Sequence, residues 1–158
     1  MTHMHAAQDQ VVLITRVFDA PRDLVFRAWT DPAQVAQWFG PEGFDTPRET
    51  VAIDLRVGGR FELTMVRRET GDRHPVRYEI AELDPPRLLV LTSEPMPELG
   101  MHRPTFTRIE LEEDGDRTRM TLSDGPYTQS THAEAGWNGA FGKLDALFAS
   151  LRGRAGKS

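Results

Sequence analysis

Cysteine is absent from this 158-residue chain. Its absence excludes a disulfide framework, a thiolate nucleophile and any metal site with cysteine ligands. Three motifs of common enzyme classes are absent as well: a glycine-rich phosphate loop at a strand–helix junction, an HExxH zinc motif and a nucleophile elbow. We therefore expect no catalytic residues of these classes and no cofactor.

Long apolar runs and basic blocks are also missing. No run approaches the ~18 residues of a membrane span, and the start MTHMHAAQDQ lacks both the apolar region and the cleavage site of a signal peptide. We expect a cytoplasmic protein without membrane insertion. The 24 acidic and 19 basic residues are interspersed and give a formal net charge of −5. Nucleic acid and anionic membranes are therefore poor candidates for partners.

The length fits one domain, which would bury about two thirds of the surface of the unfolded chain. We expect this domain over residues 11–152, with a flexible N-terminus over 1–10 and a flexible C-terminus over 153–158. A core of this size has room for a cavity.

Two short helices are predicted after the first strand. The first covers about residues 21–30, with Pro21 at its first position. Asp31 is followed by a proline and is the predicted N-cap of the second helix. The side chain of Gln34 should reach back to Asp31, as in a capping box. The second helix should end near residues 39–40, before the next proline.

Two tryptophans lie on either side of this helix boundary. Trp29 closes the apolar face of the first helix, and we expect it to anchor that helix in the core. Trp38 ends the second helix together with Phe39. Trp38 is therefore either part of the rim of a binding site or a second piece of the core.

About seven strands are predicted. Residues 11–18 are rich in β-branched and aromatic types, residues 88–92 are more fully apolar, and the other strands alternate apolar with polar or small residues. Gly58–Gly59 and Asp114–Gly115 are predicted hairpin turns, and Asp124–Pro126 a turn that leads into the last helix. Because hairpins join nearly all strands, the sheet should be antiparallel. The predicted strands cover residues 11–18, 51–57, 61–65, 76–80, 88–92, 107–112 and 118–122.

A long amphipathic helix is predicted over residues 131–152, from a capping box of Thr131 and Glu134 to a stop at Gly153. At ~1.5 Å per residue it is about 30 Å long, enough to cross the whole sheet. The side opposite its apolar face carries small residues. Either packing of the apolar face tolerates them, or they form a close helix contact in a homodimer. They are Ala135, Gly139, Gly142, Ala146 and Ala149.

Six segments carry a family resemblance. They are RVFDAP (16–21), VFRAW (25–29), TDPAQVAQWFGP (30–41), VGGRF (57–61), ELDPPRLLVLT (82–92) and GWNGAFGKL (136–144). Together they resemble the activator of heat-shock protein 90 ATPase homologue family, which belongs to the START-like or SRPBCC superfamily. The resemblance implies an α+β helix-grip fold: a curved seven-stranded antiparallel sheet around a long C-terminal helix, with two short helices after the first strand closing one end.

The resemblance also implies a function. Many members of the superfamily hold lipids, sterols or polyketides in a cavity between sheet and helix, and others are cyclases that work in the same cavity. We expect a binder of a small hydrophobic molecule; a cyclase or hydrolase and a protein-interaction module are the alternatives. A chaperone partner is not expected, because the chaperone activators carry a further domain ahead of this one and only about ten residues precede the first strand here.

The expected ligand-binding residues are those that face inward on the strands and the long helix, together with the loop of residues 93–104. The same residues would also fill a solid core, and periodicity does not separate the two. Met96 and Met101 could form a lid or cover the edge of the sheet. The full set is Trp38, Phe39, Phe61, Leu63, Met65, Tyr78, Leu91, Met96, Met101, His102, Ile109, Met120, Trp137, Phe141 and Leu144.

Five histidines are present, and none belongs to a recognisable site. His3 and His5 lie in the N-terminal segment, where they could bind a metal only weakly, so no metal site is expected. His74 and His132 are expected on the surface. His102 is a candidate general base, but the sequence offers no carboxylate with a clear geometric relation to it.

Overall fold

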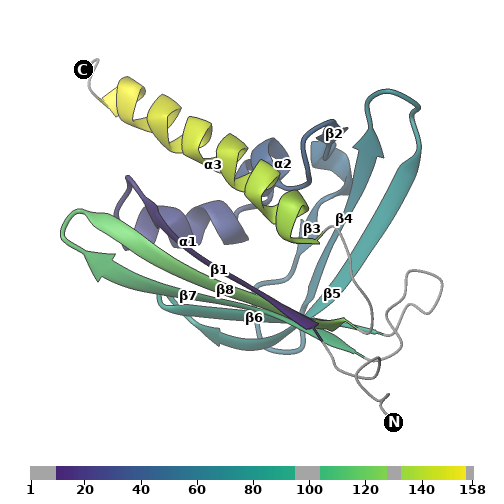
Figure 1. The fold of residues 1–158 in the computed structure, drawn as a ribbon, viewed down its shortest axis with the longest axis horizontal. Coiled ribbons are helices and arrows are strands. Elements are labelled where there is room, and N and C mark those ends of the chain that lie inside the picture. The colour runs from purple at the N-terminus through teal and green to yellow at the C-terminus, as the bar shows by residue number, and fades with distance from the viewer. Residues whose placement is uncertain (1–9, 95–103, 128–132, 156–158) are drawn as a thin grey trace, which may run out of the picture.

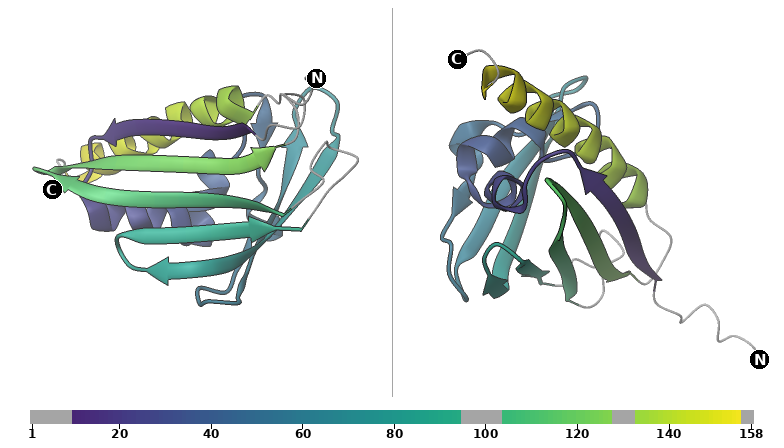
Figure 2. Two further views of the ribbon diagram at one scale, coloured as in Figure 1. Left: turned by 60° about the horizontal axis from the view of Figure 1, so that its bottom comes forward. Right: turned by 90° about the vertical axis from the view of Figure 1, so that its left-hand side faces the viewer.

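The structure is a computed structural model that describes residues 10–94, 104–127 and 133–155, with side chains described as far as Arg152. A curved antiparallel sheet forms one side of the molecule, and the three α-helices lie together on its concave side (Figures 1 and 2). The elements are β1 (Gln10–Phe18), α1 (Arg22–Thr30), α2 (Pro32–Trp38), β2 (Phe44–Asp45), a 3-10 turn (Arg48–Thr50), β3 (Ala52–Ile53), β4 (Arg60–Arg67), β5 (Arg73–Asp84), β6 (Leu88–Ser93), β7 (Thr105–Asp114), β8 (Arg117–Tyr127) and α3 (Ala133–Ala155).

The strand order confirms the predicted α+β helix-grip fold. The sheet runs β1-β8-β7-β6-β5-β4-β2, with β3 also paired to β4, and every pairing is antiparallel. Eight strands are present in the described residues, against about seven predicted, because the two-residue β2 gave no alternation signal. Figure 1 shows β4 and β5 rising from the rest of the sheet toward the first turns of α3.

The boundary between α1 and α2 is set by Asp31, as predicted. Its side chain accepts a 3.3 Å hydrogen bond from the Gln34 backbone N–H. The second half of the predicted capping box is wrong: the Asp31 N–H donates to the Arg27 carbonyl at 2.8 Å, so Gln34 Oε1 has no partner among the described residues. Pro21 is also displaced by one position, since it lies at the N-cap of α1 and not at its first helical residue.

The predicted strand over residues 51–57 is mostly wrong. Only Ala52–Ile53 pairs with β4, and Leu55 and Val57 are 43% and 63% exposed. The chain folds back instead in a tight loop, where Gly59 lies so close to Asp54 that an added Cβ would be 2.0 Å from the Asp54 carbonyl oxygen. A glycine is therefore required at this position, and the alternating apolar residues of the loop face solvent.

The predicted turn at Asp124–Pro126 is also wrong, since these residues continue β8 as far as Tyr127. Asp124 pairs with Thr107 and Gly125 with Phe106 on β7. The strand alternation therefore extends past Leu122 and carries Asp124 to the inner face of the sheet.

Helix α3 buries the predicted apolar face against the sheet and the two short helices. Trp137, Phe141, Leu144, Leu147 and Phe148 are all buried in one core cluster with residues of β1, α1 and α2. The predicted start at Thr131 lies outside the described residues. The predicted stop at Gly153 is wrong, because the helix continues to Ala155. No helix in the described part of the chain is long and apolar enough to cross a membrane.

One glycine of the small-residue side of α3 has a contact within the chain. A Cβ at Gly139 would lie 3.1 Å from the Glu42 backbone nitrogen, so Gly139 lets the segment after α2 approach the helix. A Cβ at Gly142 would meet nothing within 4 Å. The homodimer contact suggested by this side of the helix stays a prediction.

Candidate ligand cavity

A cavity of about 180 Å³ lies under the first turns of α3. Its walls come from three places: the segment after α2, the inner faces of β4, β5 and β8, and α3 itself. The lining residues are Phe39, Gly40, Pro41, Met65, Val76, Tyr78, Asp124, Tyr127, Ala133, Gly136, Trp137 and Ala140. Since an apolar cavity of about 150 Å³ is large enough for benzene, this one has room for a ligand of at least one ring.

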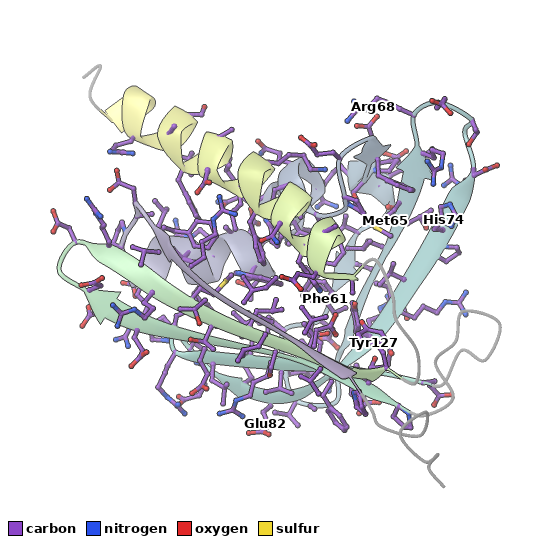
Figure 3. All side chains as sticks on the ribbon, in the orientation of Figure 1. Phe61, Met65, Arg68, His74, Glu82 and Tyr127 are labelled. Carbon is purple, nitrogen blue, oxygen red and sulfur yellow. The ribbon has the colours of Figure 1, made fainter. Side chains whose placement is uncertain are left out.

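A second cavity of about 260 Å³ adjoins the first toward the start of β5. The two share four lining residues, Met65, Val76, Tyr78 and Tyr127. Figure 3 shows Met65 on β4 and Tyr127 at the end of β8, both on the side of the molecule where α3 begins. We call the first space the inner cavity and the second the outer cavity.

Asp124 is the polar centre of the inner cavity. The residue is only 3% exposed, and its carboxylate accepts three hydrogen bonds from three different elements. Thr107 Oγ1 of β7 donates to Oδ1 at 2.9 Å. The Tyr127 hydroxyl of β8 and the Trp137 Nε1–H of α3 donate to Oδ2 at 2.6 and 2.8 Å. The carboxylate therefore joins sheet and helix at the wall of the cavity.

Both tyrosines of the chain line the cavity, and both are held in the neutral form. Burial raises the pKa of the Tyr78 hydroxyl above its usual range and the charge of Asp124 raises it further, while a hydrogen bond with Thr107 opposes the shift. Burial likewise raises the pKa of Tyr127, and the charge of Asp124 and the hydrogen bond to it add to the effect. At neutral pH both hydroxyls therefore keep their protons and can donate hydrogen bonds.

Lys143 holds one wall of the inner cavity in place. Its Nζ is half-buried and donates to the carbonyl oxygens of Pro41 and Phe44 at 3.4 and 3.3 Å. Burial, and then the charge of Arg68, lower the pKa of the ammonium group, while nearby carboxylates oppose the change. The segment after α2 is thus fastened to α3 next to the cavity.

The structure divides the predicted ligand-binding residues into three groups. Four of them line the cavities: Phe39, Met65, Tyr78 and Trp137. Met96, Met101 and His102 lie outside the described residues. The remaining eight are buried and do not line either cavity: Trp38, Phe61, Leu63, Leu91, Ile109, Met120, Phe141 and Leu144.

Trp38 lies in the core, which is the second of the two roles considered for it. It is fully buried, its ring meets Trp29 edge-on at 4.7 Å between centroids, and its Nε1–H donates to the Ala28 carbonyl at 2.9 Å. The two tryptophans therefore fasten α1 to α2, and neither reaches the cavity.

Sequence reasoning missed Asp124 and Tyr127, because the Gly-Pro pair between them resembles a turn. The signal was present in the strand pattern. Thr118, Met120 and Leu122 alternate on the inner face, and two residues further on the same phase reaches Asp124. Thr107 could have been found in the same way, two residues before Ile109.

Comparison with protein families shows which family the chain belongs to. Residues 19–149 match the family described as activator of Hsp90 ATPase homolog 1-like protein, or AHSA1. The chain belongs to this family. The AHSA1 match covers the whole cavity wall that the structure describes, from Phe39 to Ala140. No curated protein matches the chain.

Solved structures share the fold of this chain. Protein NE0264 from Nitrosomonas europaea is 23% identical, with a TM-score of 0.77 over 90% of this chain and 96% of its own. Protein CV1439 from Chromobacterium violaceum is 25% identical, with a TM-score of 0.78 over 87% and 95%. The AHSA1 protein SPO3351 from Silicibacter pomeroyi is 23% identical, with a TM-score of 0.70 over 90% and 99%.

Proposed function

We propose that this protein binds a small hydrophobic molecule in the inner cavity. The observation that carries the proposal is the lining of the cavity. Its polar groups are Asp124, two tyrosine hydroxyls and the indole N–H of Trp137, and the other side chains there are apolar or absent. A mostly apolar pocket with a few fixed polar groups is the usual form of a small-molecule site. Membership of a family with this fold adds support.

Val76 offers a direct test, because it lines both cavities. Val76→Trp should fill the space and abolish binding of apolar probes such as propylbenzene, measured by calorimetry. Val57→Trp adds the same atoms to an exposed loop and should leave binding unchanged. Equal binding by the wild-type protein and Val76→Trp would contradict the proposal.

The natural ligand can be sought by native mass spectrometry of the protein purified from its own host. A small molecule that co-purifies with the wild-type chain, and not with Val76→Trp, would be the candidate. Retention of the same molecule by both proteins would show that it binds elsewhere.

An enzyme of the cyclase or hydrolase type is the second candidate, and one observation favours it. Tyr78, Asp124 and Tyr127 all face the inner cavity, so ionisable groups converge where a substrate would lie. The Tyr127 hydroxyl already donates its one proton to Asp124, so only Tyr78 could polarise a substrate oxygen. Neither tyrosine could act as a base at neutral pH, because both hydroxyls stay protonated. Incubation of the co-purified molecule with fresh protein distinguishes the two candidates. Recovery of the molecule unchanged supports a binding protein, and its conversion into another compound supports an enzyme.

A further inference from the structure

The charge inside the inner cavity is of one sign. Among its described lining residues Asp124 is the only charged side chain, while His74 and Arg77 line the outer cavity and not the inner one. The three groups that donate to Asp124 are a threonine hydroxyl, a tyrosine hydroxyl and an indole N–H, and all three are neutral. The carboxylate is thus solvated by hydrogen bonds but has no counter-charge among these partners.

The ion pairs of the described residues all involve other carboxylates. The start of α3 carries a partial positive charge of roughly half a unit, which offsets only part of a full negative charge. A buried anion in an apolar site costs free energy unless it is paired. The Lys143 ammonium lies next to this cavity, but it donates to the carbonyl oxygens of Pro41 and Phe44 and does not line the cavity. The lining itself therefore carries one negative charge and is complementary to a cation.

Asp124 also has an acceptor site to spare. A carboxylate oxygen can accept about two hydrogen bonds. Oδ2 already accepts from Tyr127 and Trp137, whereas Oδ1 accepts only from Thr107 within the described residues. A ligand in the cavity could therefore donate to Oδ1 without displacing a protein donor.

The walls around this carboxylate are aromatic. Phe39, Tyr78, Tyr127 and Trp137 all line the inner cavity. The face of an aromatic ring attracts a cation. Since both tyrosines stay neutral, their rings add no second negative charge and act as aromatic walls with a polar edge.

From this combination we propose that the inner cavity selects a cationic ligand: a small apolar amine whose ammonium group donates to Asp124 and whose apolar part lies against the aromatic walls. The inference rests on the proposed function, because it names the chemical class of the molecule bound in the same cavity. Asp124 is then the residue that determines the preference for a cation, and the apolar walls select the ligand by its shape.

Three probes of similar shape separate the charge from the apolar part. They are 2-phenylethylamine, 2-phenylethanol and 3-phenylpropanoate, which carry a cation, a neutral donor and an anion next to one ring. The wild-type protein should bind the amine about tenfold or more tightly than the alcohol, as expected for a hydrogen bond to a charged group. The carboxylate probe should bind most weakly, because Asp124 repels it.

Asp124→Asn removes the charge and keeps the shape. It should lower the affinity for the amine to that for the alcohol, while Asp116→Asn removes an equal charge from the exposed β7–β8 turn and should keep the preference. If Asp124→Asn does not fold, Tyr127→Phe serves instead. It keeps the carboxylate and frees a site on Oδ2, so the preference for the amine should grow, and an unchanged or smaller preference would overturn the inference.

Calorimetry gives the affinities, and the indole N–H resonance of Trp137, assigned with Trp137→Phe, reports whether a probe binds beside Asp124. Equal affinity of the wild-type protein for amine and alcohol would overturn the inference and leave the proposed function intact. A preference that survives in folded Asp124→Asn would also overturn it. Failure of all three probes and of propylbenzene to bind would overturn both the inference and the proposed function.

Discussion

The indole Nε1 of Trp137 donates a 2.8 Å hydrogen bond to Oδ2 of Asp124. This bond joins the long helix to strand β8 at the cavity, and both groups are buried. An indole nitrogen can only donate, and an ionised carboxylate can only accept, so the pair has one possible direction. The bond fixes the position of α3 over the sheet next to the inner cavity.

Replacing Asp124 by alanine should destabilise the protein strongly. The change leaves three donors, from Thr107, Tyr127 and Trp137, without their acceptor in a buried site. We expect the free energy of unfolding to fall by roughly 2–4 kcal/mol, measured by urea denaturation. Asp116→Ala, in the exposed β7–β8 turn, is the control and should change it little. An equally small effect of both variants would show that the network contributes nothing to stability.

Ionisation of the two tyrosines should be visible at high pH. Tyr78 and Tyr127 are the only tyrosines of the chain, and both have a raised pKa in the folded state. Above about pH 10 the unfolded chain releases the phenolic protons and the folded chain retains them, so the free energy of unfolding falls as pH rises. Tyrosinate absorbance should therefore appear well above pH 10, together with loss of near-UV circular dichroism. Titration of the two tyrosines near pH 10 in the folded protein would contradict this prediction.

Trp29 and Trp38 should be of similar importance for stability. Both are fully buried and in contact, so truncation of either to alanine should cost about 3–5 kcal/mol in thermal or urea unfolding. Substitution of each tryptophan by phenylalanine should distinguish the two positions. Trp38→Phe loses the hydrogen bond to Ala28, whereas Trp29 Nε1 has no partner among the described residues. Trp38→Phe should therefore be the less stable of the two, and the reverse order would contradict the assigned contacts.

Two glycines of α3 form a matched pair. Gly142→Ala places a methyl group in open space and should raise the free energy of unfolding by about 0.5–1 kcal/mol, since alanine favours a helix. Gly139→Ala brings the same group to 3.1 Å from the Glu42 nitrogen. It should be less stable than Gly142→Ala by about 1 kcal/mol or more. Equal increases in the free energy of unfolding of the two variants would mean that the segment after α2 can move away from the added methyl group at little cost.

Local patterns were sufficient for the helices and for most of the strands. The apolar face of α3 and the Asp31 cap at the break between α1 and α2 follow from residues close in the chain, and the structure confirms them. Local patterns failed where a contact between distant or crowded backbone segments decided the conformation. The 54–59 loop is one example, and the continuation of β8 past Leu122 along β7 is another.

The amino-acid sequence by itself determined the order of the helices and the longer strands and most of the side chains that turn inward, because periodicity and caps act over a few residues. Only the tertiary structure decided which inward residues fill the core, such as Trp38 and Phe141, and which line the cavity, such as Tyr78 and Trp137. The reason is physical: a void is the space left when curved sheet and helix meet. Its size, and the meeting of Asp124 with donors from β7, β8 and α3, depend on all of these elements together.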